Sequence, residues 1–136
     1  MQILKTIFSA EYLNIVDLDY VALCTICSYL NIKTPLYIFS KMNIEIEAVH
    51  SPDEWALNIC KKIEGVDEYW NPIGGMTFFD RRKYQLNQID LKFQKVNLQD
   101  YEQKDRPFVS GLSIIDVLMF NSISKIREML DNYELL

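Results

Sequence analysis

The chain has 136 residues, of which 49% are apolar and 24% charged, and its formal net charge is −5 at pH 7. These values are typical of a folded globular protein and argue against disorder. The negative charge and the scattered Lys and Arg side chains exclude a nucleic-acid backbone as the main partner, because such binding needs clustered cations. The sequence has no apolar run long enough to span a membrane, and its three cysteines favour a reducing compartment. We therefore expect a single domain, residues 1–136, in the cytoplasm.

The amino-terminal part predicts one helix and one strand. Residues 1–16 are apolar but weakly patterned, so both a helix and a strand fit them. From Asp17 to Leu30 the apolar residues recur at helical spacing, and Asn31 can close this helix in the left-handed conformation. Residues 36–39, Leu-Tyr-Ile-Phe, are β-formers and predict a buried strand.

The next segment carries the clearest helix start in the chain. Residues 51–54, Ser-Pro-Asp-Glu, offer a hydroxyl at the N-cap, a proline at the first helical position and a glutamate at the third. The apolar stripe that follows begins at Trp55, and Gly65 ends the segment. Residues 66–70 then predict a second strand, which Asn71-Pro72 stops.

A short helix and a third strand follow. Asp80 can cap a helix over residues 81–86. Ile89, Leu91 and Phe93 alternate with polar side chains, and this period of two predicts a strand with one buried face. The alternating order favours an α/β domain, a small two-layer or three-layer arrangement with a short parallel or mixed sheet flanked by helices. Because three strands are few, we expect the sheet to be incomplete.

The carboxyl-terminal third is expected to be a loop followed by two helices. Residues 97–107 are polar and loop-like. Ser113 can cap a helix in which Asp116, at the third position, accepts from the first backbone amides as in a capping box. Ser122 or Ser124 can then start a last helix over residues 125–133.

Gly74-Gly75 is the first candidate for contact with a ligand. Adjacent glycines after a strand allow positive φ and close approach to a bound group, and open α/β sheets bind ligands at the carboxyl ends of strands. The plainer interpretation is a tight connection. The surrounding side chains offer an amide, a carboxylate, and two guanidinium groups suited to phosphate or carboxylate: Asn71, Asp80, Arg81 and Arg82.

The polar loop and the helix after it supply the second group of candidates. Loops of this length are often functional, so Tyr101, Gln103 and Phe108 can line a pocket, the alternative being simple surface cover. Asp116 is the candidate catalytic carboxylate, and its plainer role is in the capping box.

The cysteines and the single histidine offer little chemistry. Cys24 and Cys27 form a C-x-x-C pair, but they fall in the middle of a predicted helix, where buried thiols are expected rather than a redox pair. Together with Cys60 and His50 they could supply four metal ligands, but the spacing matches no common zinc signature. We expect neither a cofactor nor a metal, and a metal protein is the weakest hypothesis.

Two regions carry a specific pattern. The first comprises residues 69–75, Phe79-Asp80 and Leu91-Lys92-Phe93, and the second comprises Tyr101-x-Gln103, Phe108 and residues 112–121. With these motifs the chain, from about residue 12 onward, resembles the distal half of the WbqC-like family. Members of that family begin with a strand-loop segment that is not visible here, so the chain resembles the carboxyl-terminal part of such a protein.

The resemblance implies work on an activated sugar in the biosynthesis of bacterial surface polysaccharide such as O-antigen, by transfer of a small acyl or aminoacyl group. A sugar nucleotide would be the small-molecule partner. Gly74 and Gly75 would admit a phosphate or sugar, and Arg81 or Arg82 would neutralise charge. The other polar candidates would contribute hydrogen bonds and orient a hydroxyl or amine: Tyr101, Gln103 and Asp116.

A different class of function is a non-catalytic binding or assembly domain. Its partner would be the missing amino-terminal half or a second copy of the chain, because a fragment exposes apolar surface that drives association. The enzyme hypothesis requires the diglycine bend and the start of the Ile-Ile-Asp helix to meet at one cleft.

Overall fold

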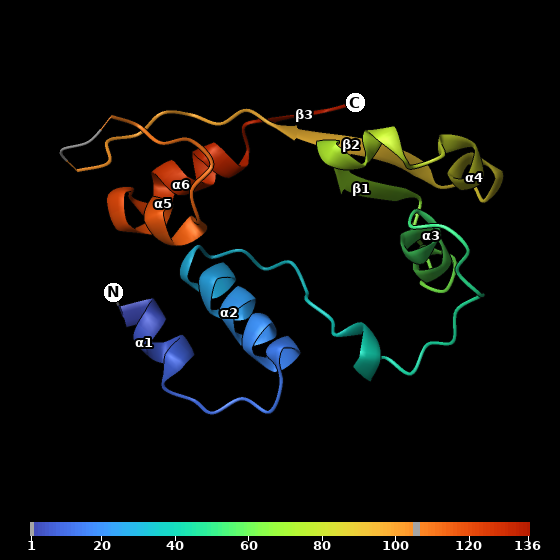
Figure 1. Cartoon of the computed structure of the whole chain (residues 1–136), viewed down its shortest axis with the longest axis horizontal. Coiled ribbons are helices and arrows are strands. Elements are labelled where there is room, and N and C mark those ends of the chain that lie inside the picture. The colour runs from blue at the N-terminus through green and yellow to red at the C-terminus, as the bar shows by residue number, and fades with distance from the viewer. Residues whose placement is uncertain (1, 105–106) are drawn as a thin grey trace. The chain divides into compact units, whose positions relative to one another are not determined.

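A computed structural model describes residues 2–104 and 107–136, and residues 1, 105 and 106 lie outside the described part (Figure 1). The chain forms two compact units, each made of two separate pieces of sequence. Unit 1 contains residues 2–43 and 98–131, and unit 2 contains residues 44–97 and 132–136. The single domain expected from length stays a prediction. Within the described residues, no helix combines the length and apolar character that a membrane crossing requires.

Unit 1 is helical. Its elements are α1 (Gln2–Phe8), α2 (Ile15–Tyr29), the short 3-10 helix η1 (Phe39–Lys41), α5 (Ile114–Phe120) and α6 (Ile123–Leu130). The predicted serine caps are confirmed, because the hydroxyls of Ser113 and Ser122 accept from backbone N–H groups at the starts of α5 and α6. Asn31 follows α2 with φ of 55°, as predicted. Side chains from four separate stretches form the core: Ile3, Ile7, Leu30, Leu118 and Ile126.

Unit 2 holds the sheet. Its elements are α3 (Glu54–Cys60), β1 (Glu68–Pro72), the 3-10 helix η2 (Ile73–Thr77), α4 (Arg81–Leu86), β2 (Asp90–Val96) and β3 (Tyr133–Leu135). The strand order is β1-β2-β3, with β1 parallel and β3 antiparallel to β2. The predicted α/β class with a short mixed sheet is therefore confirmed.

The core of unit 2 follows the predicted alternation along β2. Ile89, Leu91 and Phe93 are all buried. Tyr84, on α4, is fully buried, and its hydroxyl donates to the backbone carbonyl of Asp53 at 2.7 Å. Its ring stacks on that of Tyr69 from β1, with centroids 5.8 Å apart. These contacts hold α3, α4 and the sheet together within the unit.

Two predicted elements are wrong. Residues 36–39 form no strand, and the ring of Tyr37 is exposed. A β-forming run becomes a strand only where a neighbour pairs with it, and these residues belong to unit 1 while the sheet lies in unit 2. Conversely, α6 ends at Leu130, and Tyr133–Leu135 pairs with β2 as a strand.

The predicted helix start at residues 51–54 is displaced. Asp53 rather than Ser51 is the N-cap of α3, which is only seven residues long. Its buried face is formed by Leu57 and Asn58, whereas Trp55, expected in the apolar stripe, is 54% exposed. The Asn58 amide bonds to backbone carbonyls of residues 47 and 48, which directs that face inward.

Candidate functional site

Asp116 receives two side-chain hydrogen bonds from the polar loop before it. The Tyr101 hydroxyl donates to Oδ2 of Asp116 at 2.5 Å, and Nε2 of Gln103 donates to the same oxygen at 3.1 Å. The prediction that Asp116 accepts from the first backbone amides of α5 is wrong. The Ser113 hydroxyl caps the helix, and the Asp116 carboxylate accepts from Tyr101 and Gln103 of the loop instead. Two predicted site residues thus donate to one carboxylate oxygen of a third.

The two donor residues also contact residues further along the same loop. Gln103 is buried, and its side-chain amide pairs with Val109 twice: the Val109 N–H donates to Oε1 at 2.7 Å, and Nε2 donates to the Val109 carbonyl at 3.0 Å. The ring of Phe108 meets Tyr101 edge-on, with centroids 5.3 Å apart. Burial and the bond to Asp116 raise the pKa of Tyr101, so its hydroxyl remains a donor at neutral pH.

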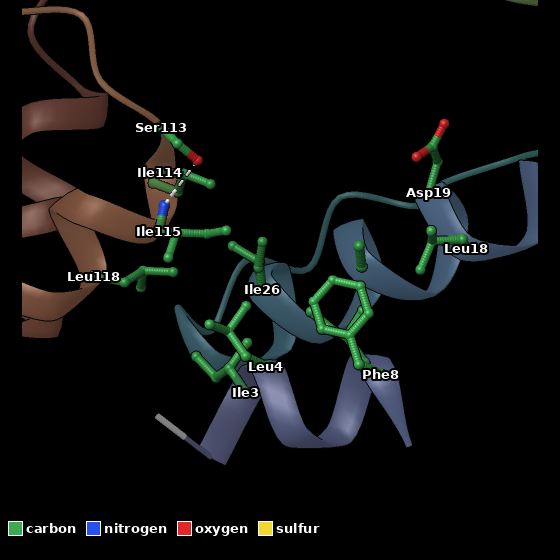
Figure 2. A pocket seen from close by; sticks show the side chains of 12 residues that line it. Ile3, Leu4, Phe8, Leu18, Asp19, Ile26, Ser113, Ile114, Ile115 and Leu118 are labelled. Atoms are coloured by element: carbon green, nitrogen blue, oxygen red, sulfur yellow. Dashed lines mark hydrogen bonds between the residues drawn. The ribbon is translucent and has the colours of Figure 1, made fainter. Parts of the chain in front are cut away.

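An apolar cavity of about 220 Å³ lies against the same helix. Figure 2 shows the side chains of α5 facing those of α1 and α2 across it. Asp19 and the Ser113 hydroxyl are its polar lining groups. Sequence reasoning missed this cavity, because residues 1–16 gave no clear periodicity. Its principal apolar walls are Ile3, Phe8, Leu18, Ile26, Ile114 and Leu118.

The diglycine segment of unit 2 differs from its prediction. Gly74 and Gly75 follow β1 as expected, but they form part of η2, and neither has positive φ. A Cβ on Gly75 would lie 1.8 Å from Nδ2 of Asn71, whereas nothing lies within 4 Å of a Cβ on Gly74. Gly75 is therefore required for packing against Asn71, whose Oδ1 accepts from the Tyr69 hydroxyl at 3.1 Å. Of the two glycines, only Gly74 has open space beside it.

The charged candidates beside it have distinct roles. Asp80 caps α4 as predicted, accepting from the Arg82 N–H at 2.9 Å. Arg81 donates to the carbonyls of Leu91 and Leu136 at 2.7 and 3.0 Å and lies over the Phe93 ring. Arg81 therefore ties α4 to the sheet. The Arg82 side chain is 87% exposed, with its Nε 3.5 Å from Asp80, and it is the guanidinium of the two that a dissolved anion can reach.

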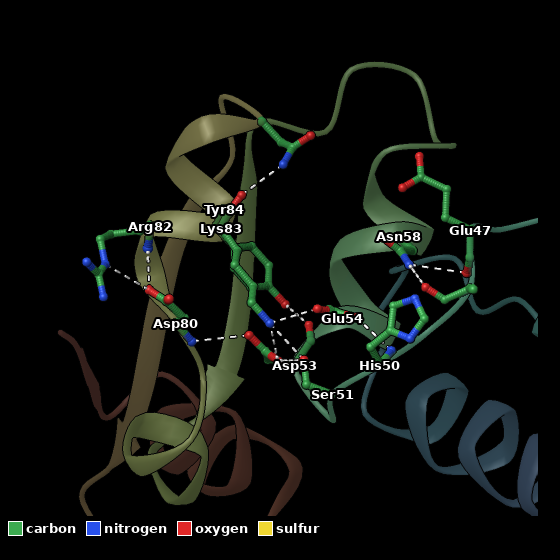
Figure 3. A network of polar contacts seen from close by, with 12 residues as sticks. Glu47, His50, Ser51, Asp53, Glu54, Asn58, Asp80, Arg82, Lys83 and Tyr84 are labelled. Carbon is green, nitrogen blue, oxygen red and sulfur yellow. Dashed lines mark hydrogen bonds and ion pairs between the residues drawn. The ribbon is translucent and has the colours of Figure 1, made fainter.

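A polar network around Lys83 was missed (Figure 3). Its Nζ donates to Oγ of Ser51 at 2.7 Å, to Oδ1 of Asp53 at 3.2 Å and to Oε1 of Glu54 at 2.8 Å. Residues 51–54 were noticed only as a helix start, and no sequence signal links them to Lys83. Ser51 and Lys83 have the spacing of a nucleophile and a base, but bonds from Lys83 to Glu54 and Asp53 raise the pKa of Lys83. The ammonium stays charged and cannot take a proton from Ser51.

The pKa values of the two carboxylates in this network, Asp53 and Glu54, lie below their usual range. Hydrogen bonds from Lys83 and from the His50 N–H lower the pKa of Glu54 to about 2. Burial raises the pKa of Asp53, but hydrogen bonds from Ser51, the Asp80 N–H and Lys83 outweigh it, so that pKa also lies below its usual range. The network is therefore ionised throughout the neutral range.

The three cysteines are free thiols, with Cys24 and Cys27 in unit 1 and Cys60 in unit 2. Burial raises the pKa of the Cys60 thiol, which lowers its reactivity. Within residues 2–104 and 107–136, no group of three or more His, Cys, Asp or Glu side chains is arranged to hold a metal ion.

The predicted site residues fall in both units. Tyr101, Gln103 and Asp116 belong to unit 1 and are joined by hydrogen bonds. The other predicted site residues belong to unit 2: Asn71, Gly74, Gly75, Asp80, Arg81 and Arg82. A cleft shared by the two groups stays a prediction.

The helices and the mixed sheet define a small α/β protein. The WbqC-like protein family matches residues 1–128 of the chain, so the protein belongs to that family. The match includes the first eleven residues, which the motif resemblance left out. No curated protein and no solved structure matches the chain.

Proposed function

We propose that the protein transfers a small acyl group onto an activated sugar during assembly of bacterial surface polysaccharide such as O-antigen. One observation on helix α5 carries the proposal. The helix presents Asp116, a carboxylate that accepts two side-chain hydrogen bonds, and it also lines an apolar cavity of about 220 Å³. Asp116 does not itself line the cavity, but it follows Ile115, which does, and an apolar pocket with a few fixed polar groups nearby is typical of small-molecule sites. The free thiols of its cysteines agree with the reducing cytoplasm as the place of action.

Each part has a role in transfer. The acceptor's hydroxyl or amine forms a bond to the acyl carbon while the donor's leaving group departs, and Asp116 orients the acceptor and takes its proton. Tyr101 and Gln103 keep the carboxylate in place. The apolar walls suit the hydrocarbon part of an acyl or aminoacyl group, and Asp19 offers a carboxylate to the ammonium of an aminoacyl group.

Within unit 2, Arg82 and Gly74 are the groups that we propose for contact with a phosphate. Arg82 offers an exposed guanidinium, and Gly74 leaves room at the end of β1. A planar guanidinium suits phosphate recognition. Arg81 is withdrawn from that role by its bonds to backbone carbonyls.

The test combines binding with turnover. The protein is screened by thermal shift against nucleotide sugars and short-chain acyl donors, and stabilising pairs are incubated and analysed for acylated product by mass spectrometry. We expect Asp116→Asn to lose product formation by roughly 100-fold or more, as for removal of a general base, while still melting cooperatively. Asp100→Asn, an exposed carboxylate in the same loop, is the matched control and should retain turnover.

Two results would contradict the proposal. One is that no nucleotide sugar and no acyl donor shifts the melting temperature. The other is that Asp116→Asn and Asp100→Asn turn over equally well, which would remove Asp116 from the chemistry.

A non-catalytic assembly domain is the second candidate. The observation that favours it is an apolar groove of about 350 Å³ in unit 1, to which the exposed side chains of Tyr20, Leu23 and Tyr37 contribute. Such a surface drives association. Sedimentation equilibrium of the wild type and of Leu23→Asp tests it: a self-associating wild type that Leu23→Asp makes monomeric supports this candidate.

A further inference from the structure

We infer that unit 2 holds a separate small-molecule site whose ligand is an uncharged, hydroxyl-rich compound of the sugar class. The site is a pocket of about 430 Å³ beside α3 and α4. It requires neither Asp116 nor any transfer reaction, so it stands if the protein only binds. Most of its wall is polar: Glu47, His50, Glu54, Asn58, Lys61 and Lys83.

The charges in this wall are balanced in pairs. Nζ of Lys61 lies 2.6 Å from both carboxylate oxygens of Glu47, and Nζ of Lys83 lies 2.8 Å from the Glu54 carboxylate. A phosphate would have to displace a carboxylate from its lysine, and a cation would face two ammonium groups. Because each of these two ammonium groups already has a carboxylate partner, the pocket favours a ligand without net charge.

Asn58 supplies an acceptor with no hydrogen bond from the described residues. The residue is only 5% exposed, and its Nδ2 donates to the Glu47 and Ala48 carbonyls at 3.2 and 3.5 Å. These bonds fix the amide plane, and Oδ1 accepts no bond from residues 2–104 or 107–136. Since no fully buried side-chain oxygen or nitrogen of the described residues lacks a partner, this oxygen retains contact with solvent, and a ligand hydroxyl can donate to it there.

Other groups complete a surface that suits hydroxyls. Asn87 donates to the Lys83 carbonyl at 2.8 Å, which fixes a second amide in the wall. Figure 3 shows the His50 imidazole on the same side of the network as Asn58 and Glu47. A hydroxyl both donates and accepts, so a polyol can use fixed ammonium donors and amide or carboxylate acceptors together. Leu57 and Leu86 add apolar area for the C–H faces of a sugar ring.

The test is an NMR titration of the whole protein with methyl glycosides of glucose, galactose, mannose and N-acetylglucosamine, and separately with inorganic phosphate. We expect at least one glycoside to shift the side-chain signals of His50, Asn58 and Asn87, with a dissociation constant on the order of 1 mM. His50→Ala and Asn87→Ala should each weaken that binding by roughly tenfold, the value of one hydrogen bond. Gln85→Ala, an exposed residue of α4 outside the pocket, should bind as the wild type does.

The inference is overturned if no glycoside shifts these signals, if phosphate shifts them as strongly, or if Gln85→Ala weakens binding as much as the pocket variants do. Since His50 is exposed and its ring makes no hydrogen bond to a described residue, His50→Ala keeps the test decisive should Asn87→Ala unfold. Failure of this inference and failure of the proposed transfer reaction are distinguishable, because glycoside binding is read at the signals of His50, Asn58 and Asn87 in unit 2, whereas the transfer reaction is read by product formation.

Discussion

The ammonium of Lys83 neutralises two carboxylates that a short segment brings together. Asp53 is 2% exposed, and a buried carboxylate is tolerable only when it is paired and hydrogen-bonded. Lys83, Ser51 and the Asp80 N–H supply those bonds. The network therefore joins the start of α3 to α4 through charge as well as through the buried Tyr84 hydroxyl.

We predict that this network makes the protein acid-sensitive in a defined range. The pKa of Glu54 is about 2 in the folded protein against an ordinary value of 4.5, so the unfolded chain binds more protons between these values. The stabilisation is complete above about pH 4.5 and is lost as the pH falls toward about 2. Urea unfolding of the wild type and of Lys83→Met at a series of pH values should show a shallower pH dependence for Lys83→Met.

The matched control is Lys125→Met, which removes an exposed pair between residues three apart on α6. Its unfolding midpoints should fall with pH as the wild type's do. Parallel curves for Lys83→Met and the wild type would show that Lys83 does not set the titration of Asp53 and Glu54.

Among the elements, α5 depends on the loop before it. The helix is only seven residues long and has the Ser113 cap at its start, and isolated helices of this length are unstable in water. Packing of Leu118 in the core and the bonds from Tyr101 and Gln103 to Asp116 provide the stability that so short a helix lacks by itself. The position of the candidate catalytic carboxylate is thus a property of loop and helix together.

We predict that Gln103→Ala loosens this arrangement. The substitution removes the bonds of Gln103 to the Val109 N–H and carbonyl and to the Asp116 carboxylate, and one such hydrogen bond contributes about 1 kcal/mol to stability. Urea unfolding should show that loss, and hydrogen exchange at the Val109 amide should accelerate. Gln99→Ala, the same change in the same loop without a side-chain bond to a described residue, should alter neither measurement. Equal behaviour of the two variants would mean that Gln103 does not order the loop.

At the scale of the molecule, each unit has a hydrophobic cluster of its own. The cluster of unit 1 centres on Leu30 and Ile126, and that of unit 2 centres on Tyr84 and Phe93. Burial of such clusters is the dominant favourable term in folding. Each unit therefore contains its own source of stability, although the sequence of each is interrupted by the other.

We predict that damage to one cluster is felt mainly in its own unit. Phe93→Ala removes a fully buried ring and should cost about 3–5 kcal/mol. Hydrogen exchange read by mass spectrometry should accelerate over residues 44–97, with a smaller change over residues 107–131. Ile126→Ala is the reciprocal variant and should reverse the pattern. Uniform acceleration in both variants would show one cooperative domain, as the chain length suggested.

Local chemistry sufficed for the elements that the sequence predicted correctly. The alternation through Ile89, Leu91 and Phe93 gave the buried face of β2, because a strand's period depends on the backbone alone. Asp80, Ser113 and Ser122 were recognisable as caps because each bonds to an amide two or three residues away. Gln103 and Tyr101 were placed near Asp116 by family resemblance, since nothing in their spacing requires contact.

Tertiary structure alone decided the rest. Residues 36–39 are β-formers but pair with no strand, whereas residues 133–135, the first of which was expected in a helix, pair with β2. A strand needs a partner that local sequence does not specify. The Lys83 network and the cavity beside α5 join side chains about 30 to more than 100 positions apart in the chain, a separation that short-range patterns do not encode. Composition and periodicity determined the fold class, and local hydrogen bonding determined the helix caps. Long-range packing determined which carboxylates are hydrogen-bonded and where the cavities lie.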